Sequence, residues 1–491
     1  MIWTVLALVV STTTGLALIK TLWPIGKSEG SDWLLQFSLA CGFGLGATSL
    51  VLFLVLAAKG SAGSTIEILA ESVLLLGLLA VSYLRRNAPV GQNVECRTPE
   101  SRISFLWGSA LAIAFAFTFL SFILVSRRAP HGSWDGWSIW NLHARFLFRG
   151  GSQFWRDTFS PLLYYYKPDY PLLIPASIAR LWTYTNHETL FAPALVAEVF
   201  TFALALLTTS AVARLRGGKQ GILAGLLLLG TPAFVDLGAS QCADVAVGFF
   251  FLATLALFCL DDCMGHNRGH IALAGVAAGM GAWTKNEGLM LLLIVLAVRI
   301  ALSFRTQGLR VLVRQHAPFV AGLTPVILPI LYFKRLVPTN DMVAGQGLHA
   351  TLARLVSLSR YKITGKAFLH ETLFFGGWFA SIILVLAFYA LLVGLNDNTK
   401  LRKTVTAQLL AIAVAAAGYF FVYIVTPNDV AWQLKWSLER VFMQLWPATI
   451  FSLFLLLRTP EEAVEGENEV DPGEKTSGIK ITSAVPEVAS S

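Results

Sequence analysis

The sequence predicts an all-α polytopic membrane protein, and its composition and its apolar runs both lead to that fold class. Hydrophobic residues make up 55% of the 491 residues and charged residues only 13%, and the mean hydropathy is +0.65. A soluble domain of this length does not hide so much apolar surface. The apolar residues form runs long enough to cross a hydrocarbon core of about 30 Å, which takes roughly 20 helical residues. Because backbone polar groups find no water in lipid, helices are the expected spanning structure.

About thirteen apolar runs follow one another along the chain. The predicted spans are 2–20, 33–57, 64–84, 104–125, 187–213, 220–236, 242–260, 270–284, 288–303, 317–334, 374–395, 405–426 and 441–457. The runs 270–284 and 288–303 are each short for a span. The first run lacks a basic segment before it and an obvious cleavage site, so it is expected to be a retained span and not a signal peptide.

Basic residues orient these spans, because short loops rich in Lys and Arg stay in the cytoplasm. Such loops follow spans three, five, nine and eleven. The scheme places the N-terminus outside and the acidic tail inside, with segments 126–186, 335–373 and 427–440 outside. Arg127 and Arg128 fall on the outer side, against the rule. The expected location is the inner (plasma) membrane, with the functional face on the outer, periplasmic side.

Several function classes have no support in the sequence. The five cysteines form no metal or disulfide pattern. The net charge of +8 follows from membrane topology, and no basic run with interleaved aromatics indicates nucleic-acid binding. No Gly-rich phosphate loop indicates ATP-driven transport. The tail 459–491 is rich in Glu, Gly, Pro, Ser and Thr and is predicted to be disordered.

The segment HGSWDGWSIWNLHARFLFRGG at 131–151 begins where an apolar span ends. Asp135 lies between Trp134 and Trp137, just outside the predicted bilayer, and an amphipathic helix with His143, Arg145 and Arg149 among its polar positions is expected to follow. A carboxylate at this depth could act as a general base on a headgroup substrate. The alternative is that Asp135 only caps the helix that starts at Gly136.

Two further acids lie on the predicted outer face. Lys167 and Asp169, in YYYKPDYP, could hold a phosphate and orient an acid, or they could form a solvated loop bounded by prolines. Asp244, in SQCADVAV, stands at the mouth of an apolar span, where acids are costly and often functional. A simple helix cap is the alternative for Asp244.

Cations accompany these acids on the same predicted face. Lys285, Asn286 and Glu287 interrupt an apolar stretch, and a buried Lys–Glu pair or a plain turn are the alternatives to a functional role. Lys334, Arg335 and Arg440 stand at predicted helix ends, where snorkelling explains isolated cases. Taken with Arg145, Arg149 and Lys167, these cations favour an anionic ligand such as a lipid phosphate.

The order of these motifs resembles the GT-C superfamily of polytopic glycosyltransferases, which includes aminoarabinose transferases and protein O-mannosyltransferases. WDGWSIWNLHARFL at 134–147 and YPLLIPASIARLW at 170–182 look like the two juxtamembrane helices of its first outer loop, here 126–186. KPDYP, CADVAVGFFFLATLALF at 242–258 and AWTKNEGL at 282–289 look like its later motifs. The resemblance covers roughly 105–303 and elsewhere rests on hydropathy.

The chain also departs from that family. Asp135 is a single acid where mannosyltransferases often carry an acidic pair, which leaves a divalent metal open and no other cofactor expected. Three spans precede the span of the catalytic-type loop, and no large soluble domain follows the last span. The expected organisation is therefore 1–103 as added N-terminal helices, 104–303 as a GT-C-like core, 304–458 as C-terminal helices and 459–491 as a cytoplasmic tail.

The resemblance implies transfer of a sugar from a polyprenyl-phosphate donor to a hydroxyl of a lipid, glycan or protein acceptor at the outer face. Asp135 would be the general base. The other residues expected to bind substrate are Lys167, Asp169, Asp244, Lys285, Glu287 and Arg440. The alternative is a secondary transporter or flippase for an anionic lipid or sugar; the absence of an internal repeat and the gathering of polar residues at one face favour the enzyme. A non-catalytic assembly subunit also stays open.

Overall fold

The computed structural model describes residues 2–23, 30–61, 63–85, 105–150, 154–265, 267–304, 309–338 and 347–464. These residues form helices and no β-strand, which confirms the all-α fold class. The α-helices are α1 (Ile2–Leu22), α2 (Gly30–Lys59), α3 (Ser64–Arg85), α4 (Phe105–Arg128), α5 (Asn141–Arg149), α6 (Leu173–Thr185), α7 (Phe191–Arg216), α8 (Gly218–Leu229), α9 (Pro232–Ala239), α10 (Asp244–Met264), α11 (Arg268–Thr284), α12 (Asn286–Phe304), α13 (Leu309–Leu336), α14 (Leu348–Leu355), α15 (Leu358–Phe374), α16 (Ile382–Val393), α17 (Thr399–Val425) and α18 (Val430–Leu456).

Nine helices in the described part of the chain are long and apolar enough to cross a membrane, and eleven if two bent pairs each count as one span. The predicted number of about thirteen is therefore not confirmed by these criteria. The bent pairs are α8–α9, broken by 65°, and α15–α16, broken by 76°. The two remaining runs fall short for different reasons: α11 has only 17 residues, and the first half of α18 carries Lys435, Glu439 and Arg440.

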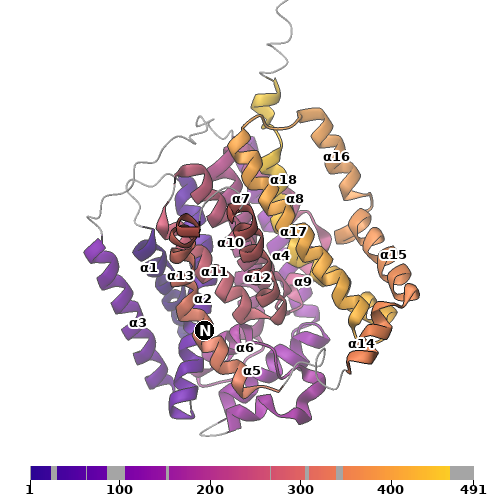
Figure 1. Ribbon diagram of the computed structural model, residues 1–491. Helices are drawn as coiled ribbons and strands as arrows, with labels where there is room; N and C mark the ends of the chain where they lie inside the picture. The colour runs from indigo at the N-terminus through magenta and orange to yellow at the C-terminus, as the bar shows by residue number, and fades with distance from the viewer. Residues whose placement is uncertain are drawn as a thin grey trace, which may run out of the picture.

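The helices differ in burial: some form a packed core, and others form an exposed apolar periphery. Helix α10 lies at the centre and is fully buried over its apolar window, surrounded by α2, α7, α11 and α18. Helices α3 and α4 are mostly exposed although they are apolar; α3 lies at the left edge of Figure 1, and α15 and α16 lie at the right. Exposed apolar helices around a packed core are what an integral membrane protein requires, because lipid covers them.

The predicted N-terminal addition 1–103 contributes to that core. Helix α2 is mostly buried and packs on α1 and α7 through close backbone contacts. A Cβ at Gly15 would lie 2.1 Å from the oxygen of Ala40, and a Cβ at Gly44 would lie 2.0 Å from the oxygen of Ser11. The α11–α13 crossing is similar, since a Cβ at Gly275 would lie 2.1 Å from a backbone oxygen of α13. Small residues allow membrane helices to approach this closely.

The predicted outer loops contain more helix than expected. The described part of 335–373 includes α14 and most of α15, and residues from Val430 onward in 427–440 form the first turns of α18. Asp429 caps α18 by accepting a hydrogen bond from the Trp432 backbone at 2.7 Å. Only 459–464 of the predicted disordered tail belong to the described residues, so that prediction otherwise lies outside them.

Candidate functional site

Asp135 is held in place by a loop that lies against the junction of α9 and α10. The Ser133 backbone donates to the oxygen of Ser240 at 2.9 Å, and Gln241 Nε2 donates to the oxygen of Pro130 at 3.0 Å. A Cβ at Gly132 would lie 2.4 Å from the Ser240 oxygen. This glycine, at a φ of +73°, lets the loop approach α9 and fixes the position of the acid.

The Asp135 side chain does not cap the helix that follows it, as the alternative interpretation required. Asp135 precedes η1 (Gly136–Trp140), a single π-helical turn, and makes no side-chain capping bond to it. Its Oδ2 accepts a hydrogen bond from Arg440 Nη1 of α18. The Asp135 side chain is 27% exposed, so the carboxylate is anchored on one side and open on the other.

Asp244 is the most completely bonded acid of the site. It is the first residue of α10 and is 1% exposed. Its Oδ1 accepts from Lys285 Nζ at 2.9 Å and from Gln444 Nε2 at 2.6 Å, and its Oδ2 accepts from Arg440 Nε at 2.8 Å. A buried carboxylate is tolerated only when charges and hydrogen bonds compensate it, and these three donors do so.

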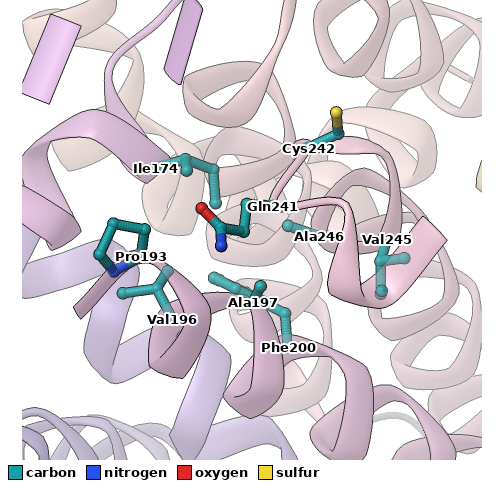
Figure 2. Close-up of a pocket in the computed structure, with 10 residues that line it drawn as sticks. Ile174, Pro193, Val196, Ala197, Phe200, Gln241, Cys242, Val245 and Ala246 are labelled. Atoms are coloured by element: carbon teal, nitrogen blue, oxygen red, sulfur yellow. The ribbon is translucent and has the colours of Figure 1, made fainter. Parts of the chain in front are cut away.

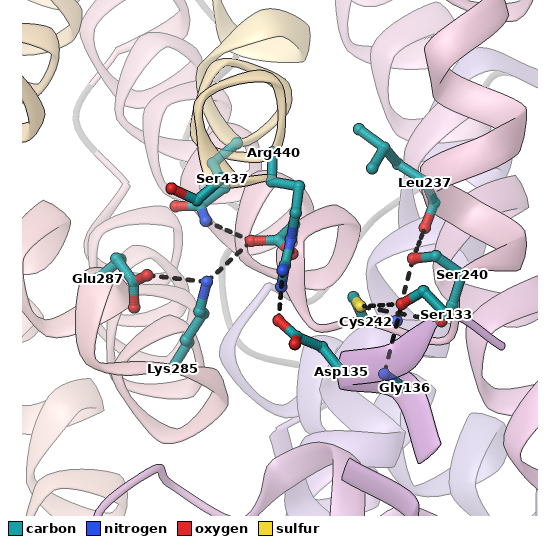
Figure 3. A network of polar contacts seen from close by, with 12 residues as sticks. Ser133, Asp135, Gly136, Leu237, Ser240, Cys242, Lys285, Glu287, Ser437 and Arg440 are labelled. Atoms are coloured by element: carbon teal, nitrogen blue, oxygen red, sulfur yellow. Dashed lines mark hydrogen bonds and ion pairs between the residues drawn. The ribbon is translucent and has the colours of Figure 1, made fainter. Parts of the chain in front are cut away.

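We define the Asp244 network as Asp135, Asp244, Lys285, Glu287, Arg440 and Gln444. Lys285 pairs with Glu287 at 2.8 Å as well as with Asp244, and Figure 3 shows Lys285 and Glu287 to the left of Arg440 and Asp135 below its guanidinium. The network joins the loop after α4, the start of α10, the α11–α12 turn and α18. The Lys–Glu pair and the turn that the sequence left as alternatives are both present, within a larger set of contacts.

A second cluster, which we call the Asn286 bridge, comprises Asp169, Asn286 and Lys334. Asn286 Nδ2 donates to Asp169 Oδ2 at 2.7 Å, and Lys334 Nζ donates to Asn286 Oδ1 at 2.7 Å and to the Asp169 backbone oxygen at 3.0 Å. Lys167 lies two residues before Asp169, at a left-handed φ of +54°. Because Lys285, Asn286 and Glu287 are consecutive, one turn connects both clusters.

The arginines of α5 form their ion pairs with Glu188, outside the Asp244 network and the Asn286 bridge. Arg149 Nη2 donates to Glu188 Oε2 at 2.7 Å, and Arg145 lies 3.5 Å from the same carboxylate. The hydrogen bond from Arg149 lowers the pKa of Glu188. His143, expected among the polar positions, is fully buried, and burial lowers its pKa to about 4. These residues therefore attach α5 to the bundle and leave the site to other cations.

Exposed aromatic rings border Asp135. Trp134 and Trp137 are 55% and 45% exposed, their ring centroids are 6.2 Å apart, and Tyr166 stacks on Trp134 at 6.4 Å. Tryptophan favours membrane interfaces, where an apolar ring meets polar groups. The residues on either side of Asp135 in the sequence thus provide an exposed aromatic surface suited to an amphipathic substrate.

A small, mostly apolar pocket lies between α6, α7 and the α9–α10 junction. Figure 2 shows Gln241 among otherwise apolar side chains from α6, α7 and α10. The side-chain Oε1 of Gln241 accepts a hydrogen bond from Nδ2 of Asn141, the first residue of α5, at 2.8 Å, so the polar end of Gln241 is already used to hold α5. The pocket and the loop of Asp135 therefore share one structural residue.

Two members of the site were missed from the sequence. Gln444 lies four residues after Arg440, on the same face of α18, and Tyr419 donates to Gln444 Oε1 at 2.5 Å. For Gln444 the spacing from Arg440 was the available signal, and for Tyr419 it was only the place of a polar group in an apolar helix. Among the described residues, no group of three or more His, Cys, Asp or Glu side chains is arranged to hold a metal ion.

The fold and site together define a polytopic membrane protein with a buried ionic network at one end of its helix bundle. The start of α10, the end of α11 and the loop that follows α4 meet at that end. Comparison of the chain with protein-family models, with curated proteins and with solved structures finds no match. Its activity must therefore be argued from the site.

Proposed function

We propose that this protein transfers a sugar from a polyprenyl-phosphate donor to an acceptor hydroxyl at the membrane surface, as the GT-C resemblance implies. The observation that carries the proposal is the Asp135 carboxylate, bonded to Arg440 on its buried side and partly exposed between Trp134 and Trp137. A fixed carboxylate at an aromatic interface can meet both a lipid-linked sugar and a hydroxyl. We further propose that this end of the bundle faces the periplasm across the inner (plasma) membrane.

In the proposed reaction, the acceptor oxygen forms a bond to the anomeric carbon while the bond from that carbon to the phosphate oxygen breaks. The acceptor hydroxyl passes its proton to Asp135, and the polyprenyl phosphate leaves with the bonding electron pair. General-base assistance of this kind typically accelerates a reaction by about 100- to 10,000-fold. Arg440 would orient the carboxylate, and Asp244 would fix Arg440 from behind through the 2.8 Å bond to Nε.

The charge of the departing phosphate needs cations beyond the Asp244 network. Within that network three carboxylates, of Asp135, Asp244 and Glu287, face two cations, Lys285 and Arg440. Lys334 is better suited, because its two hydrogen-bond acceptors in the Asn286 bridge are neutral oxygens. We propose Lys334, together with Lys167, as the groups that hold the phosphate, since fixed cations stabilise developing negative charge. Lys285 then has mainly the role of holding Asp244 and Glu287.

The test is an assay with purified protein in liposomes. A panel of polyprenyl-phosphate sugars and a lipid or peptide acceptor would be supplied in the same leaflet, without an ion gradient. The proposal expects a glycosylated acceptor and an equal amount of free polyprenyl phosphate. A parallel preparation of Asp135→Asn controls for spontaneous donor hydrolysis.

A transporter for an anionic lipid or sugar is the second candidate, and the bent pairs α8–α9 and α15–α16 favour it. Broken helices often form transporter binding sites, which lie near the bilayer midplane. Here Asp244, Lys285 and Glu287 stand where α10, α11 and α12 begin or end, and Arg440 and Gln444 reach them from within α18. The same liposomes decide between the two, because a transporter moves intact substrate to the other leaflet and releases no polyprenyl phosphate.

A further inference from the structure

Helix α3 buries two acids although most of its surface is exposed. Glu67 and Glu71 are both 0% exposed, whereas Leu76 of the same helix is 64% exposed. Residues four apart share one face of a helix, and this face is turned toward α1 and α6. Figure 1 shows α3 at the edge of the bundle, beside α1. The two carboxyl groups are therefore the buried contacts of an otherwise lipid-facing helix.

Glu71 has a complete set of partners. Arg180 of α6, itself fully buried, bonds to both Glu71 oxygens, with Nη2 2.7 Å from Oε2, and the Tyr184 hydroxyl donates to Oε2 at 2.5 Å. The remaining guanidinium bonds go to Ser11 Oγ at 2.9 Å and to the Ala7 oxygen at 3.0 Å, both on α1. Glu71 and α1 therefore use the donors of Arg180.

Glu67 has no such set. Neither of its carboxyl oxygens has a hydrogen-bond partner of ordinary geometry within the described residues, and the neighbouring Thr183 hydroxyl donates to the Ala179 oxygen at 3.0 Å instead. Two buried carboxyl groups therefore share one guanidinium. The other charged groups on the neighbouring helices do not help: Lys59 is exposed at the end of α2, and Lys20 lies in the last turn of α1, far from the first turn of α3. A second negative charge at this depth would be uncompensated, and such charges are costly in membrane helices.

We propose that Glu67 is a proton-binding site that couples the attachment of α3 to pH. In the packed bundle Glu67 holds a proton, so the Glu67, Glu71 and Arg180 cluster carries no net charge. When that proton leaves, Glu67 and Glu71 repel each other, and α3 loosens from α1 and α6. This role is independent of the chemistry at Asp135.

The sign of the pH effect follows from linkage. Removing the proton from Glu67 would place a second carboxylate beside Glu71 in the folded chain, whereas the unfolded chain exposes both groups to water. Raising the pH therefore favours the unfolded chain, so stability falls as the pH rises. Glutamine has the shape of a protonated glutamate and carries no charge, so Glu67→Gln removes this contribution.

The experiment measures the Tm of the detergent-purified full chain across about pH 5 to pH 9 for the wild type, Glu67→Gln and Glu71→Gln. We expect the Tm advantage of Glu67→Gln over the wild type to grow by several degrees as the pH rises. Glu71→Gln, which loses its ion pair, should be less stable than the wild type at every pH. A constant difference between Glu67→Gln and the wild type would overturn the proposal.

Infrared spectroscopy supplies a second measurement that survives a folding failure of the variant. At neutral pH the wild type should show the carbonyl stretch of a protonated carboxyl, and this band should disappear in alkaline buffer as the Tm falls. Absence of the band at neutral pH would overturn the proposal. Stabilisation of the wild type by sodium ions at fixed pH would also overturn it, since a metal cation would then balance the charge.

Discussion

Two of the places where ion pairs join distant segments of this bundle differ in burial. The first place is the Asp244 network. The second, which we call the C-terminal clasp, joins Arg216 and Lys219 to Glu462 and Glu461, with Lys219 Nζ 2.6 Å from Glu461 Oε1. The clasp lies just after the end of α18, about 25 Å along the helix from Arg440 at 1.5 Å per residue. Lys219, Glu461 and Glu462 are all partly exposed, whereas Asp244 and Lys285 are buried.

This difference shows that the number of charges in a cluster does not decide how much the cluster contributes to the free energy of unfolding. In the clasp, water can replace either partner of an exposed pair, and such pairs contribute about 0–1 kcal/mol. In the Asp244 network the central acid Asp244 and its partner Lys285 are buried, and Arg440 is only 18% exposed. Removing Asp244 therefore leaves two cations charged in a region with little access to water. The following changes test this contrast.

The largest expected effect is on catalysis at the exposed edge of the network. Asp135→Asn keeps the shape of the side chain but removes the proposed base, so turnover should fall by about 100- to 10,000-fold. Donor-dependent product formation in liposomes is the measurement. Asp157→Asn, an exposed acid in the same segment, is the matched control and should retain activity. Wild-type turnover in a folded Asp135→Asn protein would remove Asp135 from the mechanism.

The next effect is on stability at the centre of the network. Asp244→Ala leaves Lys285 and Arg440 without their shared acid, and breaking a buried pair typically costs about 3–5 kcal/mol. Thermal unfolding in detergent, followed by tryptophan fluorescence, measures the loss. A decrease in stability below about 1 kcal/mol would show that water reaches this acid and that the contrast with the clasp is wrong.

A substitution of His143 tests whether burial without an ion pair also affects the stability of the bundle. Its pKa of about 4 lies below the ordinary value, so the unfolded chain binds a proton that the folded chain excludes. Stability should therefore fall as the pH decreases from about 6.5 to about 4, by up to about 3 kcal/mol. His143→Asn should flatten the unfolding profile over this range. An unchanged profile would assign the acid sensitivity to other groups.

A substitution of Lys334 tests whether the Asn286 bridge binds the donor phosphate. If it holds the donor phosphate, Lys334→Ala should lose a charged hydrogen bond of about 1.5–3 kcal/mol, which is about a 10- to 150-fold weaker Kd. Binding of a polyprenyl-phosphate sugar to the purified protein measures this. The neighbouring Arg335 is exposed, and Arg335→Ala serves as the control with an unchanged Kd. Equal losses in both variants would indicate general electrostatic attraction without a defined site.

The smallest effect belongs to the clasp. Lys219→Ala removes a partly exposed pair with Glu461, and the free energy of unfolding should change by less than about 1 kcal/mol. Thermal unfolding in low and in high salt should also differ little between the variant and the wild type. A loss comparable to that of Asp244→Ala would mean that exposure does not separate the two regions.

The sequence could predict which residues meet, but not how they pair. Alternating spans bring Asp135, Asp244 and Lys285 to one end of the bundle whatever their side chains do, and the apolar runs alone define the fold class. The pairing of Arg440 with two acids depends on the rotation of α18. The sequence-based prediction left residues 430–440 of α18 in a loop because they are too polar for a span.

Other features were out of reach for identifiable reasons. The polar positions of α5 were expected to face water, yet its nine residues are covered on more than one side, so periodicity could not place His143. The spacing of Glu67 and Glu71 in the sequence is itself a signal of a buried partner. Two acids four residues apart in an apolar span are rare unless they face a partner. That partner, Arg180, is more than a hundred residues away in sequence.

The close crossings of α1 with α2 and of α11 with α13 have a consequence for the genetics of this protein. At Gly15, Gly44 and Gly275 even an alanine would put a carbon within about 2 Å of a backbone oxygen, so a whole helix would have to move. A saturation library selected for function should therefore lose nearly every allele at these three codons. The resulting map would contain intolerant sites far from Asp135. These sites would reflect the close spacing of the helices and not a role in catalysis.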